Sequence, residues 1–202
     1  RFDSPLSQMF LDASAQNGIA LNPDYNGAVQ EGSFLYQVTH KNGERCSAAK
    51  GYLTPNLSRP NLKVITHAVS ARILLDGRRA RGIAYHQDNQ LKEVRARREV
   101  VLCGGAFGSP QLLMLSGIGP GEHLRTHGIA VSHDLPGVGQ HLHDHVDVVQ
   151  VVDTPDSTES FGLSLPAAWR TLGDIRQWRD HRQGRLTTNF AEAGAFFRSR
   201  ED

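Results

Sequence analysis

The stretch Val100–Pro120, VVLCGGAFGSPQLLMLSGIGP, decides how this chain is organised. It begins with an apolar run that ends at Cys103 and is typical of a strand buried on both faces. The small residues Gly104-Gly105-Ala106 follow and leave the backbone open to close approach. Ser109-Pro110 is suited to start a helix and Gly117 to end it. A strand, a small-residue corner and a helix N-terminus predict a nucleotide-binding unit of a doubly wound sheet.

Size and composition exclude several classes of protein. The chain holds 202 residues, enough for one domain or for pieces of two, and its formal net charge is +1. The basic cluster Arg95-Ala96-Arg97-Arg98 lies beside a predicted strand and indicates a solvated face, so nucleic acid is not an expected partner. Cys46 and Cys103 form neither a disulfide framework nor a zinc-ligand spacing, and no apolar run reaches membrane-spanning length. We expect a cytoplasmic protein, with peripheral attachment to the inner membrane left open.

The segments around the central stretch alternate between helical and strand patterns. Residues 4–17 have apolar side chains at helical spacing, with either Ser4 or Ser7 as the candidate N-cap. Residues 167–179 have the same apolar spacing. Four runs of strand-forming residues, 61–66, 69–75, 81–86 and 92–98, lead towards the central stretch and predict an antiparallel meander with a tight turn at Asp76-Gly77. Residues 146–152 and 184–199 also have the pattern of strands.

The central stretch also resembles a family signature. The pattern Gly105-Ala106-x-x-Ser109-Pro110-x-Leu112-Leu113-x-x-Ser116-Gly117-Ile118-Gly119-Pro120 is similar to the second signature of the glucose–methanol–choline (GMC) family of flavin oxidoreductases. Asp24-Tyr25-Asn26-Gly27 and Gly43-x-Arg45-x-Ser47-Ala48-Ala49 match the same family in the same order. An ordinary buried β-turn-α unit explains the capping residues but not this many coincident positions.

The resemblance extends over essentially the whole chain and implies its fold. We expect a mixed α/β (α+β) architecture: part of an FAD-binding doubly wound domain with a β-meander, plus parts of an antiparallel-sheet substrate domain. Residues 46–146 are the expected partial FAD-binding domain, and residues 1–45 and 147–202 are the expected substrate-domain segments.

The resemblance also implies cofactor-binding residues. The position matching Ser70 contacts the adenine of FAD through its main chain, and the family commonly has valine there. Gly104, Gly105 and Ala106 are expected beside the cofactor. Residues 135–145 resemble a run that passes beside the flavin, with His141 in place of the usual asparagine; in it Asp144 and His145 are expected to be structural residues on the flavin side.

Two further groups of residues are candidates for a site. Asn189 and Glu192 have counterparts in the substrate domain of acceptor-linked alcohol and choline dehydrogenases, so they are expected on the substrate side. His141, His143 and His145 would share one face of a strand, which raises a metal-binding module as an alternative. No second cluster of ligands accompanies them, and we predict no metal site.

Two parts that the family requires are missing from the 202 residues. The dinucleotide fingerprint Gly-x-Gly-x-x-Gly is absent, because Gly137-Val138-Gly139 continues to Leu142. The family's catalytic histidine, near the C-terminus of full-length members, is also absent. We therefore expect an internal segment that contains no catalytic residue, binds no flavin tightly by itself and oxidises nothing.

The resemblance implies a function for the full-length parent. It would oxidise a primary, aliphatic alcohol to an aldehyde by hydride transfer to FAD, with a non-oxygen electron acceptor such as a quinone. Choline is the second expected substrate, and a non-catalytic structural fragment is the alternative from another class. Uncovered apolar surface leads us to expect self-association of the segment.

Overall fold

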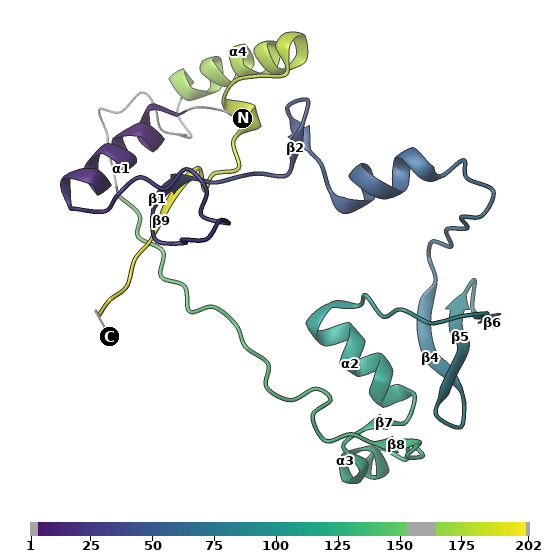
Figure 1. The fold of residues 1–202 in the computed structure, drawn as a ribbon. Coiled ribbons are helices and arrows are strands. Elements are labelled where there is room, and N and C mark those ends of the chain that lie inside the picture. The colour runs from purple at the N-terminus through teal and green to yellow at the C-terminus, as the bar shows by residue number, and fades with distance from the viewer. Residues whose placement is uncertain (1–3, 153–164, 201–202) are drawn as a thin grey trace. The chain divides into compact units, whose positions relative to one another are not determined.

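The computed structural model describes residues 4–152 and 165–200, which divide into two compact units (Figure 1). One unit comprises residues 1–62 and 151–202, and the other comprises residues 63–150. Helices and antiparallel strands occur together, which confirms the mixed α/β fold class. The assignment of residues 46–146 to an FAD-binding domain, with substrate-domain segments on either side, stays a prediction.

The unit of residues 1–62 and 151–202 combines two longer helices with short strands. Strand β1 pairs antiparallel with β9 from Gly32↔Phe196 to Leu35↔Ala193, and β2 pairs with β3 in a hairpin. Helix α1 begins after Ser4, the first of the two serines that the sequence offers as its cap, and the Ser4 hydroxyl accepts the Leu6 N–H at 3.2 Å. The elements are α1 (Pro5–Gln16), β1 (Gly32–Leu35), β2 (His40–Lys41), β3 (Glu44–Arg45), a π-helical turn (Ala49–Leu53), a 3₁₀ turn (Thr54–Asn56), α4 (Leu165–His181), a second 3₁₀ turn (Arg185–Thr187) and β9 (Ala193–Phe196).

The core of this unit is a cluster of aromatic rings around Phe34, which is 1% exposed. The Tyr25 ring stacks on Phe34 with centroids 4.0 Å apart, and Phe196 brings β9 to within 5.1 Å of it. Tyr36 meets the same ring edge-on at 5.2 Å. Stacked and edge-to-face contacts add to the free energy of burying these rings, so the cluster stabilises the β1–β9 pair.

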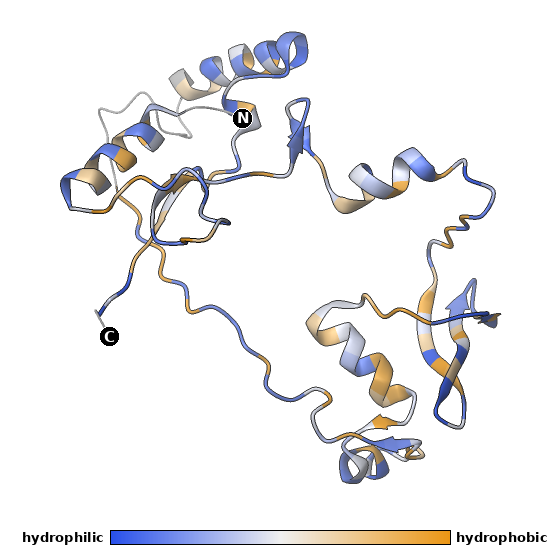
Figure 2. Ribbon diagram, viewed as in Figure 1, coloured by the Kyte–Doolittle hydropathy of each residue, from blue (hydrophilic) through white to orange (hydrophobic). Residues whose placement is uncertain are grey.

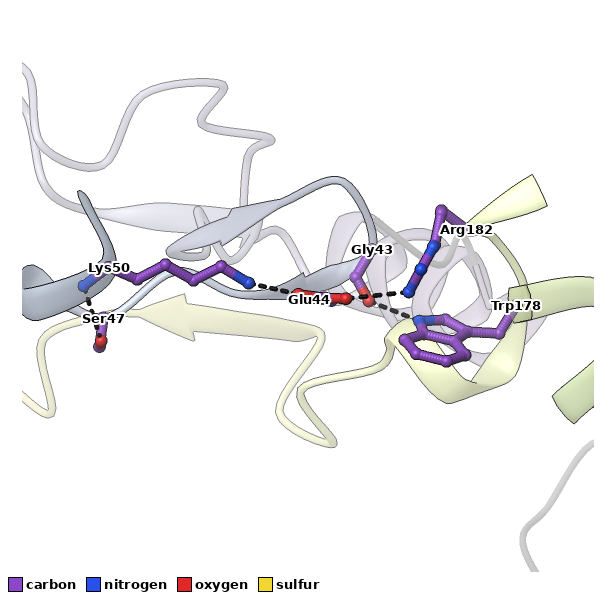
Figure 3. Close-up of polar contacts among 6 residues, drawn as sticks. All are labelled: Gly43, Glu44, Ser47, Lys50, Trp178 and Arg182. Atoms are coloured by element: carbon purple, nitrogen blue, oxygen red, sulfur yellow. Dashed lines mark hydrogen bonds and ion pairs between the residues drawn. The ribbon is translucent and has the colours of Figure 1, made fainter. Parts of the chain in front are cut away.

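A polar cluster ties the β2–β3 hairpin to the C-terminal end of α4 (Figure 3). Trp178 Nε1 donates to the Gly43 carbonyl oxygen at 2.8 Å, and the Arg182 guanidinium lies 4.2 Å above the Trp178 ring. The Glu44 carboxylate accepts hydrogen bonds from Lys50 and, at 2.9 Å, from Arg182. The Lys50 hydrogen bond and charge, followed by those of Arg182, hold the pKa of Glu44 below its ordinary value.

The unit of residues 63–150 is built on an antiparallel meander in the order β4-β5-β6, which confirms the predicted meander except at residues 61–66, which are not a strand. Helix α2 packs against β4, and the two are joined by the Ile73 N–H, which donates to Ser116 Oγ at 2.8 Å. Figure 2 shows that the C-terminal half of α2 and much of β4 are hydrophobic. The elements are β4 (Val69–Asp76), β5 (Arg79–Gln87), β6 (Gln90–Arg95), α2 (Gly105–Leu115), β7 (Ile118–Gly119), α3 (Gly121–Thr126) and β8 (His133–Asp134).

The central stretch differs from the prediction at its beginning. Residues 100–103 are not a strand, and the Val101 side chain is 71% exposed. A strand requires a neighbour for its backbone hydrogen bonds, and no described strand pairs with these residues. Helix α2 starts at Gly105, so Ser109 is not its N-cap; Ser109 Oγ accepts the Gly104 N–H at 3.0 Å instead. Gly117 ends the helix as predicted, with φ +81°.

Two more segments differ from the predicted strands. Residues 146–152 carry five exposed valines and have no strand partner among the described residues, and of residues 184–199 only Ala193–Phe196 is a strand. Among the described helices, none has the length and apolar composition needed to cross a membrane.

Candidate functional site

A cavity of about 450 Å³ lies between the meander and helix α2 in the unit of residues 63–150. The meander contributes Ser70 and Ile83, the stretch after it contributes residues 101–104, and α2 contributes residues between 108 and 115. Ser70 and Gly104 are separated by more than thirty positions in the sequence, yet both line this cavity. The fold thus brings together two of the residues that the sequence predicts beside a cofactor.

The lining of the cavity combines apolar side chains with backbone. Ile83, Leu102, Leu112 and Leu115 contribute hydrocarbon, whereas Ser70, Ser109 and Gln111 are its polar side chains. Strand β4 is an edge of its sheet among the described residues, because β5 is its one strand neighbour there. Backbone groups along such an edge remain available to a ligand. The arrangement suits a flat, partly apolar ring that is recognised by main-chain hydrogen bonds.

Three glycines lie at the start of α2, and two of them, Gly104 and Gly108, line the cavity. Gly105 has φ +76°, which a residue with a side chain rarely adopts. A Cβ at Gly104 would lie 3.0 Å from the backbone of Gly108 and Ser109, so this position admits only glycine without a shift. A Cβ at Gly108 would meet nothing within 4 Å. Gly108 therefore leaves open space in the cavity lining.

Gly108 is a site residue that the sequence reasoning did not single out. The spacing of the glycines indicates it: Gly108 follows Gly104 by four positions, and residues four apart lie on one face of a helix. Gly105 and Ala106 form the first turn of α2 but do not line the cavity.

Asp144 and His145 do not join the other predicted residues. Both are exposed, neither lines the cavity, and the contact between them is local: the His145 N–H donates to Asp144 Oδ1 at 2.8 Å. His141 and His143 are exposed in the same extended stretch. Within residues 4–152 and 165–200, no group of three or more His, Cys, Asp or Glu residues is placed to hold a metal ion, so the metal-module alternative gains no support.

Asn189 and Glu192 belong to the other unit, on the loop that leads into β9. Both carboxylate oxygens of Glu192 accept hydrogen bonds from hydroxyl groups, one from Ser7 at 2.9 Å and the other from Thr188. The Asn189 side-chain amide donates to the Ala191 carbonyl oxygen at 2.6 Å. The structure thus places these two residues together in one hydrogen-bonded loop, and their contact with substrate stays a prediction.

Comparisons with protein families and with curated proteins both find oxidoreductases. Residues 1–147 match the family described as GMC oxidoreductase. The chain is 41% identical over 198 residues to an alcohol dehydrogenase (acceptor) of Pseudomonas putida, covering 97% of this chain and 36% of that protein. It is 42% identical over 200 residues to an oxygen-dependent choline dehydrogenase of Rhizobium johnstonii, covering 98% of this chain and 36% of that one.

A solved structure agrees with these sequence relatives. An FAD-dependent oxidoreductase from Chaetomium thermophilum superimposes with a TM-score of 0.75 at 28% identity, covering 93% of this chain and 33% of that one. The chain spans 36% of the length of each of the two curated relatives named above. Because residues 1–147 match the family, and they make up most of the 202, this chain belongs to the GMC oxidoreductase family.

Proposed function

We propose that this chain is part of an FAD-dependent enzyme that oxidises a primary, aliphatic alcohol to an aldehyde. FAD, when bound, would accept the hydride, and a non-oxygen acceptor such as a quinone would take up the electrons. The observation that carries the proposal is the cavity shared by Ser70 and Gly104, in a chain that is 41% identical to an acceptor-linked alcohol dehydrogenase.

The residues present fit an FAD molecule on two observations. The cavity lined by Ser70, Gly104 and Gly108 is largely apolar and leaves open space beside Gly108, as the adenine end of the cofactor requires. Strand β4 presents an unpaired edge within the described chain, so main-chain contact at Ser70 needs no particular side chain. FAD, when bound, supplies the hydride acceptor. The described residues would hold its adenine, and the expectation that none of the chain's residues is catalytic stays a prediction.

Choline is the second candidate substrate, favoured by the 42% identity to an oxygen-dependent choline dehydrogenase. A quaternary ammonium ion is bound by aromatic faces or by an available carboxylate. Both oxygens of the Glu192 carboxylate accept hydrogen bonds from hydroxyl groups, which fix its position in the loop and leave its negative charge in place. Self-association, cytoplasmic location and peripheral attachment to the inner membrane stay predictions.

The experiment uses the full-length protein that contains this chain. The purified protein is expected to carry FAD, seen by its visible absorbance, and to reduce an artificial electron-acceptor dye with primary alcohols from ethanol to octanol. Choline at the same concentrations should give a lower kcat/KM than octanol. A colourless protein that stays colourless with added FAD, or one that turns over choline best, would overturn the corresponding part of the proposal.

A further inference from the structure

One side of the cavity between the meander and α2 is lined by residues at helical spacing. Gly108, Gln111, Leu112 and Leu115 follow one another at intervals that place them on one face of α2, and all four line the cavity. Glycine and leucine have no polar side-chain group. Gln111 is therefore the one residue of this face whose side chain can form hydrogen bonds with a ligand.

The polar side chains that α2 contributes to the cavity differ in what they already bind. Ser109 Oγ accepts the Gly104 N–H at 3.0 Å. The side-chain amide of Gln111 makes no hydrogen bond with any residue of 4–152 or 165–200, and Gln111 is exposed. A ligand that fills the cavity displaces the water around this amide. Leaving the amide without a partner would then cost binding free energy, so a matching ligand offers it both an acceptor and a donor.

The lining also indicates that the bound part of the ligand is uncharged. Among the described residues that line the cavity, none has a charged side chain. Phosphate groups are held by positive charge or by helix N-termini, whereas a neutral aromatic ring suits an apolar lining with a few polar groups. Of the parts of FAD, the adenine base therefore fits this lining and the pyrophosphate does not.

Adenine carries the groups that a glutamine amide needs. Its N6 amino group is a donor and its neighbouring N7 is an acceptor, and one amide pairs with both at once. The second N6 hydrogen and N1 form another donor–acceptor pair, which is left for main-chain groups at the edge of β4. Main chain at Ser70 and the side chain of Gln111 can thus bind different edges of the same base.

We propose that Gln111 is a cofactor-binding residue whose side-chain amide binds N6 and N7 of the adenine of FAD. This inference rests on the proposed function. It makes the cavity selective for adenine over hypoxanthine, which carries an oxo group at carbon 6. The edge of hypoxanthine beside N7 therefore has two acceptors and no donor, and the amide cannot form both bonds.

The test measures the affinity of the full-length apoprotein for FAD and for deamino-FAD, in which hypoxanthine replaces adenine. Flavin fluorescence during titration gives both values. Gln111→Met should weaken FAD binding by about tenfold, the size expected for a bidentate contact between an amide and adenine. It should weaken binding of deamino-FAD by less than about threefold, because the analogue forms at most one of the two bonds.

Gln90→Met is the matched control. Gln90 is an exposed glutamine at the start of β6 in the same unit, and it does not line the cavity. The control should leave both affinities within about twofold, as expected for a surface change. Methionine and glutamine have similar helix propensities, so Gln111→Met should keep α2 intact, and the Tm of the apoprotein checks this.

The outcomes separate this inference from the proposed function. Equal losses of affinity for FAD and deamino-FAD in Gln111→Met, or no loss for either, would overturn the role of Gln111 and leave the proposed function standing. A full-length wild-type protein that binds no FAD would overturn both. The expected loss of preference in a protein that binds FAD but oxidises no alcohol would support the role of Gln111 and overturn the proposed substrate.

Discussion

The two units form their candidate sites in different ways. In the unit of residues 63–150, the cavity is lined by backbone, glycine and mostly apolar side chains. The turn at the start of α2 is held by a hydrogen bond between residues five positions apart, from the Gly104 N–H to Ser109 Oγ. In the other unit, the loop 188–192 is shaped by side-chain hydrogen bonds, one of which joins Ser7 to Glu192 across 185 positions of sequence. One site is lined by main chain and mostly apolar side chains, and the other is shaped by polar side chains.

This difference determines which substitutions each site tolerates. Main-chain contacts survive a change of side chain, so serine at position 70, where the family commonly has valine, is compatible with the cavity. Side-chain networks do not survive such changes, because removing one partner leaves the other without its hydrogen bond. The three predictions below probe this comparison, from the largest expected effect to the smallest.

The largest effect is expected at the aromatic core of the unit that contains the loop 188–192. Phe34→Ala removes a ring that is 1% exposed and contacts Tyr25, Tyr36 and Phe196. It should lower the free energy of unfolding by about 3–5 kcal/mol, measured by urea denaturation. Phe197→Ala, at an exposed position, should change it by less than about 0.5 kcal/mol. Equal effects of the two variants would show that the aromatic cluster does not support this unit.

A smaller effect, on FAD binding, is expected at the cavity between the meander and α2. Gly108→Leu fills open space in the cavity and should weaken FAD binding in the full-length protein by about tenfold, the equivalent of roughly 1.4 kcal/mol of overpacking. Helix α2 itself should not be weakened, because leucine favours a helix more than glycine does.

Ser70→Val is the matched control for that prediction. It changes a side chain at the same cavity but keeps the main chain, so FAD affinity should stay within about twofold, or roughly 0.4 kcal/mol. The measurement is flavin fluorescence during titration of the apoprotein. A greater loss in Ser70→Val than in Gly108→Leu would reverse the comparison between main-chain and side-chain recognition.

The sequence predicts the elements that depend on local signals. Ser4 caps α1 and Gly117 ends α2, because capping and left-handed glycine are properties of a few neighbouring residues. The meander follows from its alternating runs and from the Asp76-Gly77 turn. The existence of α2 is predicted correctly, but its start is not, since Gly105 rather than Pro110 is its first residue.

The sequence pattern does not predict features that depend on contacts between residues far apart in the sequence. Residues 100–103 have the composition of a buried strand, but a strand forms only where another strand pairs with it. The resemblance indicates Ser70 and Gly104, and the fold supplies their shared cavity. Nothing in the sequence shows that Ser7 and Thr188 engage Glu192, or that Phe190 takes a positive φ, because these follow from tertiary contacts.

The smallest effect is expected at the polar cluster around Glu44, because its charges are close to solvent. The folded-state pKa of Glu44 lies below its ordinary value of 4.5, so its pairing with Lys50 and Arg182 stabilises the fold fully above that ordinary pKa. That contribution is lost as pH falls through the lower, folded pKa. Glu44→Gln should therefore lower the urea midpoint slightly at pH 7, and the difference from wild type should shrink towards pH 3. Glu93→Gln, which removes an exposed pair with Arg95, is the control and should change the midpoint less at pH 7. A Glu44→Gln difference that stays constant from pH 7 to pH 3 would show that the charge of Glu44 is not what stabilises the hairpin against α4.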